Sequence, residues 1–105
     1  MKKKLNVHYI KESEVANTIR GIRRGTYFGI TYRKKDGSLR TAVAQRGQSH
    51  QINITGTGET ASEALQKGRI KYLEHKQGVP CYRQCDIARL LSIRYKGMFF
   101  VIDRA

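Results

Sequence analysis

The clearest structural signal in this chain is the stretch TYFGITYRKKDGSLRTAVAQRG, residues 26–47. Polar and apolar residues alternate on both sides of Asp36-Gly37, a dipeptide typical of a two-residue turn in a β-hairpin. Such a turn would place Tyr32 opposite Thr41 and Ile30 opposite Val43. The stretch therefore predicts an antiparallel hairpin with one buried face and one exposed face.

This register predicts which side chains lie on each face of the hairpin. The core face would hold Phe28, Ile30, Tyr32, Leu39 and Val43. The opposite face would hold Tyr27, Thr31, Arg33, Arg40, Ala42 and Arg46. Because both strands place apolar residues on the same side, the two halves of the hairpin agree on which face is buried.

A second hairpin is predicted in LLSIRYKGMFFVID, residues 90–103. Lys96-Gly97 is its expected turn, which places Ile93 opposite Phe100 on an apolar face. We expect this face to share a core with the first hairpin. The predicted common core is Phe28, Ile30, Tyr32, Val43, Ile93 and Phe100.

A third pair of strands is predicted in IKYLEHKQGVPCYR, residues 70–83, around Gln77-Gly78. Pro80 has no N–H group to donate, so we expect it at the start or the edge of a strand. Residues 86–89 suit one tight helical turn between two strands.

Residues 13–24 predict a helix, because Val15, Ile19 and Ile22 recur at helical spacing. Ser13 is the expected N-cap, and Gly25 is expected to end the helix. The basic residues of this helix either complement the dipole at its C-terminus or contact a ligand. They are Arg20, Arg23 and Arg24.

The segment 48–68 is expected to contain a short helix. Thr60 and Glu63 have the spacing of a capping box at the start of that helix. The helix either stops at Gly68 or continues through residues 60–76, and the alternation after Gly68 favours a strand there.

Charge restricts the class of partner. The 105 residues suit a single domain and contain 21 Lys and Arg against 8 Asp and Glu, a net charge of +13. Such an excess is typical of proteins that bind nucleic acid or a nucleoprotein, and it excludes an acidic mimic of DNA.

The sequence contains no motif with catalytic or metal-binding spacing, so we expect no enzyme activity, no metal and no cofactor. Cys81 and Cys85 lack a paired C-x2-C or histidine motif and are expected to be free thiols. Residues 56–61 match G-x-G-x-x-A, but antiparallel hairpins flank them, so a glycine loop is the better interpretation.

No apolar run approaches the length of a membrane span. No apolar stretch typical of a signal peptide follows the basic N-terminus, so we expect no export signal. With only two cysteines, the chain is expected in a reducing compartment, the cytoplasm.

The exposed face of the first hairpin is the predicted nucleic-acid-binding surface, because arginine binds phosphate and an aromatic ring stacks on bases. Its residues would be Tyr27, Arg33, Lys34, Lys35, Arg40 and Arg46. A secondary set would be Arg20, Arg23, Arg24, Arg83 and Arg94. The alternative interpretation is an ordinary solvated sheet face.

Four stretches resemble a group of small proteins found mainly in bacteriophages and mobile elements. They are residues 34–40 (KKDGSLR), 82–83 (YR), 86–89 (DIAR) and 91–97 (LSIRYKG). These proteins are described as having a Src-homology-3-like (SH3-like) β-barrel fold. The resemblance implies such a barrel, a phage or mobile-element origin and no catalytic residues. Residues 48–68 depart from the pattern of the group, which indicates either an insertion into the barrel or a different fold.

The expected organisation is therefore a single mainly β (α+β) domain over residues 1–105. Residues 1–11 would form a basic arm or first strand, residues 13–24 a helix, and residues 26–105 a five- or six-stranded antiparallel barrel. The expected function is DNA or RNA binding through the first hairpin. The alternative is a phage-encoded inhibitor that binds a host protein or nucleoprotein, such as a defence complex, in the host cytoplasm.

Overall fold

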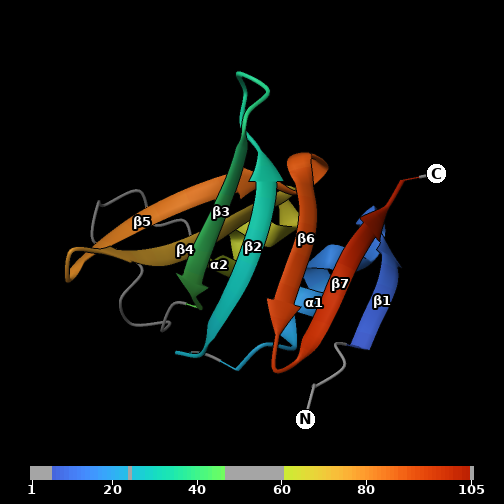
Figure 1. Cartoon of the computed structure of the whole chain (residues 1–105), viewed down its shortest axis with the longest axis horizontal. Helices are drawn as coiled ribbons and strands as arrows, with labels where there is room; N and C mark the ends of the chain where they lie inside the picture. Colours follow the sequence, from blue (N-terminus) through green and yellow to red (C-terminus); the bar gives the residue numbers. More distant parts are fainter. Residues whose placement is uncertain (1–5, 24, 47–60, 105) are drawn as a thin grey trace, which may run out of the picture.

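The computed structural model describes residues 6–23, 25–46 and 61–104, which form a mainly β domain with short helices (Figure 1). The strands are β1 (Asn6–Lys11), β2 (Tyr27–Arg33), β3 (Leu39–Gln45), β4 (Arg69–Lys76), β5 (Val79–Asp86), β6 (Leu90–Tyr95) and β7 (Met98–Asp103). The helices are α1 (Val15–Arg20) and α2 (Ala61–Gln66), with 3-10 turns η1 (Glu12–Glu14) and η3 (Ile87–Arg89). The predicted mainly β class is confirmed.

The described strands form one open seven-stranded sheet in the order β1-β7-β6-β2-β3-β4-β5. Strand β1 runs parallel to β7, whereas all other pairs are antiparallel. Because β1 and β5 lie at opposite edges, the described strands do not close. A five- or six-stranded SH3-like barrel is therefore not confirmed.

The β2–β3 hairpin differs from the prediction by one residue. The carbonyl oxygen of Lys34 accepts a bond from the Gly37 N–H at 2.9 Å, and the Lys34 N–H donates to the Ser38 carbonyl at 2.8 Å. The turn thus contains three residues, and Gly37 adopts a φ of +89°, which favours glycine. Tyr32 pairs with Arg40 instead of Thr41.

This shift turns every side chain of β3 to the opposite face. Ala42 and Ala44 are buried, whereas Leu39 and Val43 are 59% and 66% exposed, so their predicted place in the core is wrong. Arg40 lies on the core side. The predicted burial of Phe28, Ile30, Tyr32 and Ile93 is confirmed, and Phe100 packs against this core partly buried.

The other two hairpins form as predicted. Tyr95 pairs with Met98 and Ile93 with Phe100 around Lys96-Gly97. Strands β4 and β5 meet at Gln77-Gly78, and both residues of each turn have positive φ, as type I′ turns require. Pro80 lies in the edge strand β5, and η3 is the predicted helical turn.

The N-terminal helix is shorter than predicted. It ends at Arg20 with Gly21 as C-cap, and Ser13 lies inside η1 instead of capping α1. After α2 the chain enters β4 directly beyond Gly68, which confirms the favoured strand. The expected cap at Thr60 and most of the glycine loop at 56–61 lie outside the described residues.

The sheet has two unlike faces. Both helices lie on one side of it, here called the inner face, where Val15 and Ile19 of α1 and Leu65 of α2 join the sheet's core residues (Figure 1). On the other side, the outer face, no helix of the described chain covers the strands. The outer face is therefore the broad, uncovered side of the sheet in the described part of the chain.

Candidate nucleic-acid interface

Strand pairing arranges the side chains of the outer face in rows that cross the sheet. One row contains, from β1 to β3, Val7, Phe99, Arg94, Gly29 and Val43. The next contains Tyr9, Val101, Ser92, Thr31 and Thr41. The first row is apolar except for one guanidinium at its centre, and the second becomes polar toward β3.

Arg94 is the central residue of this face. Its side chain lies across Gly29, where an added Cβ would be 3.4 Å from the Arg94 Nε. Arg94 is exposed, and no described residue forms an ion pair or side-chain hydrogen bond with it. Its cationic group therefore lies flat on an apolar sheet without a counter-charge from the described chain.

The sheet is hollowed beside Arg94, where β2 begins and the β6–β7 turn follows. A shallow depression of about 370 Å³ is lined by Arg94, Tyr27, Val43, Lys96 and Met98, among others. Tyr27 is 54% exposed, and its ring lies 6.2 Å from that of His75, centroid to centroid. His75 is in turn bonded through Nε2 to Gln45 Oε1 at 3.0 Å. These contacts hold the ring of Tyr27 on the side of the depression that Arg94 also lines.

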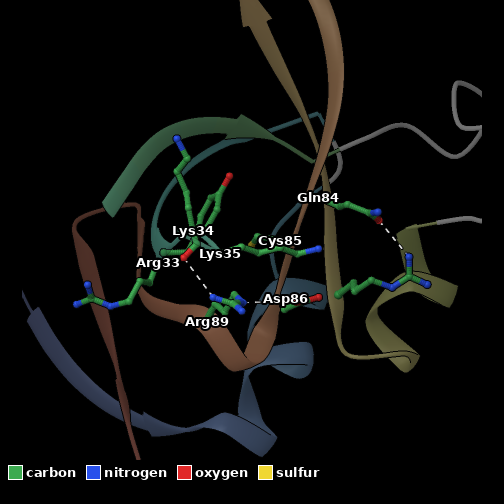
Figure 2. A pocket seen from close by; sticks show the side chains of 9 residues that line it. Arg33, Lys34, Lys35, Gln84, Cys85, Asp86 and Arg89 are labelled. Carbon is green, nitrogen blue, oxygen red and sulfur yellow. Dashed lines mark hydrogen bonds and ion pairs between the residues drawn. The ribbon is translucent and has the colours of Figure 1, made fainter. Parts of the chain in front are cut away.

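Arg33 shares the outer face with Tyr27 but lies where β2 ends. Its Nη1 donates to the Gly37 carbonyl at 2.7 Å, which holds the guanidinium against the turn. Lys34 and Lys35 follow in the turn and line a second, basic pocket (Figure 2). The six predicted primary residues are thus divided among different surroundings.

Arg40 belongs to a partly buried cluster. Its Nη2 donates to Glu74 Oε1 at 2.6 Å, and Nε of Arg83 donates to the same oxygen at 3.0 Å. Burial alone would lower the pKa of Arg40, but the bond and charge of Glu74 raise it overall. Nearby, the buried hydroxyls of Tyr32 and Tyr72 lie 3.0 Å apart, and burial raises the pKa of Tyr72.

Arg46 has a structural contact of its own. Its Nη1 donates to the carbonyl oxygens of Arg20, at 2.8 Å, and Ile22, where α1 ends. These bonds satisfy carbonyls that a helix leaves without partners. The expected common surface of Arg33, Arg40 and Arg46 is therefore wrong, because each guanidinium is held in a different place.

The secondary set is divided as well. Arg20 donates to the Asn17 side chain at 3.3 Å, and Arg23 lies exposed in the loop after α1. Arg83 is bound to Glu74, and Arg24 lies outside the described residues. Arg94 is the member that the structure places at the centre of the uncovered face.

Sequence reasoning missed the row around Gly29 and the basic residues Arg69 and Arg89. A glycine inside a strand marks a close approach by another group, so the glycine at position 29 was a signal that could have identified this row. Nothing local to Arg69 or Arg89 indicated that they lie near the first hairpin, because tertiary contacts bring them there.

The described residues contain no group of three His, Cys, Asp or Glu side chains that could hold a metal. Cys81 and Cys85 are free thiols, and burial raises the pKa of Cys85 to about 12, with the Asp86 charge adding to the shift. No described helix is long and apolar enough to span a bilayer.

Comparisons with protein-family models, curated proteins and solved structures found no match. Function is therefore inferred from the residues of this chain.

Proposed function

We propose that this protein is a non-catalytic module that binds single-stranded nucleic acid, DNA or RNA, across its outer face. The observation that carries the proposal is the unpaired Arg94, which lies across Gly29 beside the exposed ring of Tyr27. The hairpin contributes Tyr27 and Arg33, whereas β6 and β7 contribute Arg94 and Phe99.

A single strand suits this face better than a duplex. Its unstacked bases can lie on exposed aromatic side chains, and such stacking contributes roughly 1–3 kcal/mol per base. Among the described tyrosines, Tyr9 and Tyr27 have exposed rings, and Phe99 is partly exposed between Val7 and Arg94 in the first row. Arg94 is then placed to bind a phosphate between stacked bases.

The charge of the whole chain supports a polyanion as partner. A net charge of +13 attracts any nucleic acid, whereas the arrangement around Arg94 would localise the strand. Diffuse attraction and a defined site make different predictions for single substitutions.

The first test is the salt dependence of binding to a short oligothymidine by fluorescence anisotropy. Arg94→Ser should flatten the slope of log affinity against log salt by about 0.7, the value for one phosphate contact on a single strand. Arg23→Ser is the matched control, since Arg23 is also exposed but lies in the loop after α1. Equal effects of both substitutions would mean that no site exists at Arg94.

The second test removes the aromatic ring of Tyr27. Tyr27→Ala should weaken binding to a single strand by roughly 1–3 kcal/mol and change binding to a duplex much less. A loss of the same size on duplex would exclude stacking as the role of Tyr27.

A protein partner is the second candidate, and one observation favours it. Of the six exposed large hydrophobic residues in the described chain, five lie on the outer face: Val7, Tyr9, Tyr27, Leu39 and Val43. An apolar patch of this kind also suits docking of an inhibitor on a host protein. Failure to bind nucleic acid at low salt, together with capture of one defined host protein after nuclease treatment, would favour this candidate.

A further inference from the structure

A basic pocket lies where the β2–β3 turn meets η3 and the β4–β5 hairpin (Figure 2). It has a volume of about 450 Å³. Five basic residues and one acid line it: Arg33, Lys34, Lys35, Arg69, Arg89 and Asp86. The pocket is separate from the hollow beside Arg94, and its lining lies at the end of the hairpin.

Tertiary contacts hold the walls of this pocket together. Arg89 Nη1 donates to the Lys34 carbonyl at 3.2 Å, which ties η3 to the hairpin turn. The Ile87 N–H donates to the Gly68 carbonyl at 2.9 Å. In the ladder between β4 and β5, Arg69 is the residue opposite Asp86. The fold therefore brings residues from segments distant in sequence to the lining of one pocket.

Basic residues outnumber acids in the lining of the pocket. Asp86, the acid of the lining, lies 3.8 Å from Arg89, a loose and exposed ion pair that contributes little. No ion pair joins the ammonium group of Lys34 or Lys35 to a described residue, although Lys34 is close enough to Asp36 in the turn for their charges to interact. The lining therefore carries an excess of positive charge that favours an anion.

The side chains favour a phosphate group as that anion. Guanidinium groups bind phosphate oxygens in pairs, and lysine adds a mobile point charge. Arg69 Nη1 donates to the side-chain oxygen of Gln84 at 3.2 Å, which orients the guanidinium. Figure 2 shows Arg33 directed away from Asp86 and Arg89. A volume of about 450 Å³ exceeds that of one phosphate and falls in the range of pockets for nucleotide-sized ligands.

We propose that this pocket binds a terminal phosphate, a phosphomonoester carried either by a free nucleotide or by the end of a nucleic-acid strand. Lys34, Lys35, Arg69 and Arg89 are the binding residues. The proposal does not rest on strand binding at the outer face, because the two surfaces have only Arg33 in common.

Calorimetric titration at low salt tests this proposal with adenosine monophosphate and with adenosine, which lacks the phosphate. The monophosphate should bind and adenosine should not. The double variant Lys34→Ser/Lys35→Ser should weaken binding of the monophosphate at least tenfold. The matched control Lys11→Ser/Arg23→Ser removes two exposed charges elsewhere and should change it less than twofold.

Two short oligothymidines, with and without a 5′-phosphate, distinguish the sources of the phosphate. A preference for the phosphorylated strand that is lost in the Lys34/Lys35 variant assigns the pocket to strand ends. Binding of the monophosphate without that preference assigns it to free nucleotides. The proposal is overturned if neither phosphate binds, if adenosine binds equally well, or if both double variants behave alike.

The Arg94→Ser variant separates this outcome from that of the outer face. It should weaken binding of the unphosphorylated strand and leave the monophosphate affinity unchanged. Loss of monophosphate binding in Arg94→Ser would overturn the assignment to the pocket.

Discussion

Arg40 illustrates how one residue's role depends on its neighbours in space. By sequence it resembles Arg33, another arginine of the same hairpin, but its guanidinium reaches Glu74, which is 34 residues away. Its Nε is buried without a partner among the described atoms, so this end of the side chain is fitted to the protein interior. Arg40 is held by polar contacts with Glu74, whereas Arg94 forms no ion pair or side-chain hydrogen bond with a described residue.

This difference predicts opposite effects of two equal changes in charge. Arg40→Ser should lower the free energy of unfolding by about 1–3 kcal/mol, because it removes a charged hydrogen bond from Glu74. Arg94→Ser should change it by less than about 0.5 kcal/mol, as is usual for an exposed residue. Urea unfolding measures both.

Binding should show the reverse order. Arg40→Ser should affect affinity for a single strand no more than Arg23→Ser does, whereas Arg94→Ser should weaken it clearly. If Arg40→Ser left stability intact but abolished binding, Arg40 would belong to the interface after all.

At the scale of an element, strand β3 shows how a turn controls a whole face. The third residue in the turn moves Ala42 and Ala44 inward and Val43 outward. Small alanines thus lie against the core, and larger Val43 lies in the hollow beside Arg94. The turn therefore helps to shape both the core and the candidate interface.

Two neighbouring substitutions to the same residue test this register. Ala44→Leu should destabilise the protein by about 1–3 kcal/mol, because Ala44 is fully buried and added atoms in a packed core force neighbouring side chains to shift. Val43→Leu should be nearly neutral, since Val43 is 66% exposed. The midpoints of urea unfolding would rank the two variants, and the opposite ranking would indicate the two-residue turn.

For the molecule as a whole, the excess of positive charge should oppose folding. A net charge of +13 is confined to a body whose radius of gyration is 13.8 Å. The Debye length falls from about 30 Å at 10 mM salt to about 10 Å at 100 mM, so added salt screens repulsion between like charges across the molecule.

Stability and binding should consequently respond to salt in opposite directions. Between 10 mM and 100 mM sodium chloride, the midpoint of urea unfolding should rise while affinity for a single strand falls. Urea is the suitable denaturant because it is uncharged. A midpoint that fell with salt would mean that attractive pairs, such as Arg40–Glu74 and Arg104–Glu12, outweigh the repulsion.

Local patterns in the sequence determined the strands of the three hairpins and the turns of two of them. Alternation of apolar residues identifies strands, and Gln77-Gly78 and Lys96-Gly97 form type I′ turns that set the register directly. In these hairpins the information lies in residues adjacent along the chain. The same holds for Gly68, which separates α2 from β4.

The tertiary structure decided what local patterns leave open. The residues KKDGS suit both a two-residue and a three-residue turn. The choice between the two turns depends on which face of β3 is buried, and that is decided when β3 packs in the sheet. Strand β1 joins the sheet beside β7, its partner some 90 residues later, and this parallel pairing places β1 at an edge. The positions of Arg46 at the end of α1 and of Arg89 beside Lys34 likewise depend on residues distant in sequence. Such contacts arise from the combined packing of many side chains, so no short stretch of the sequence encodes them.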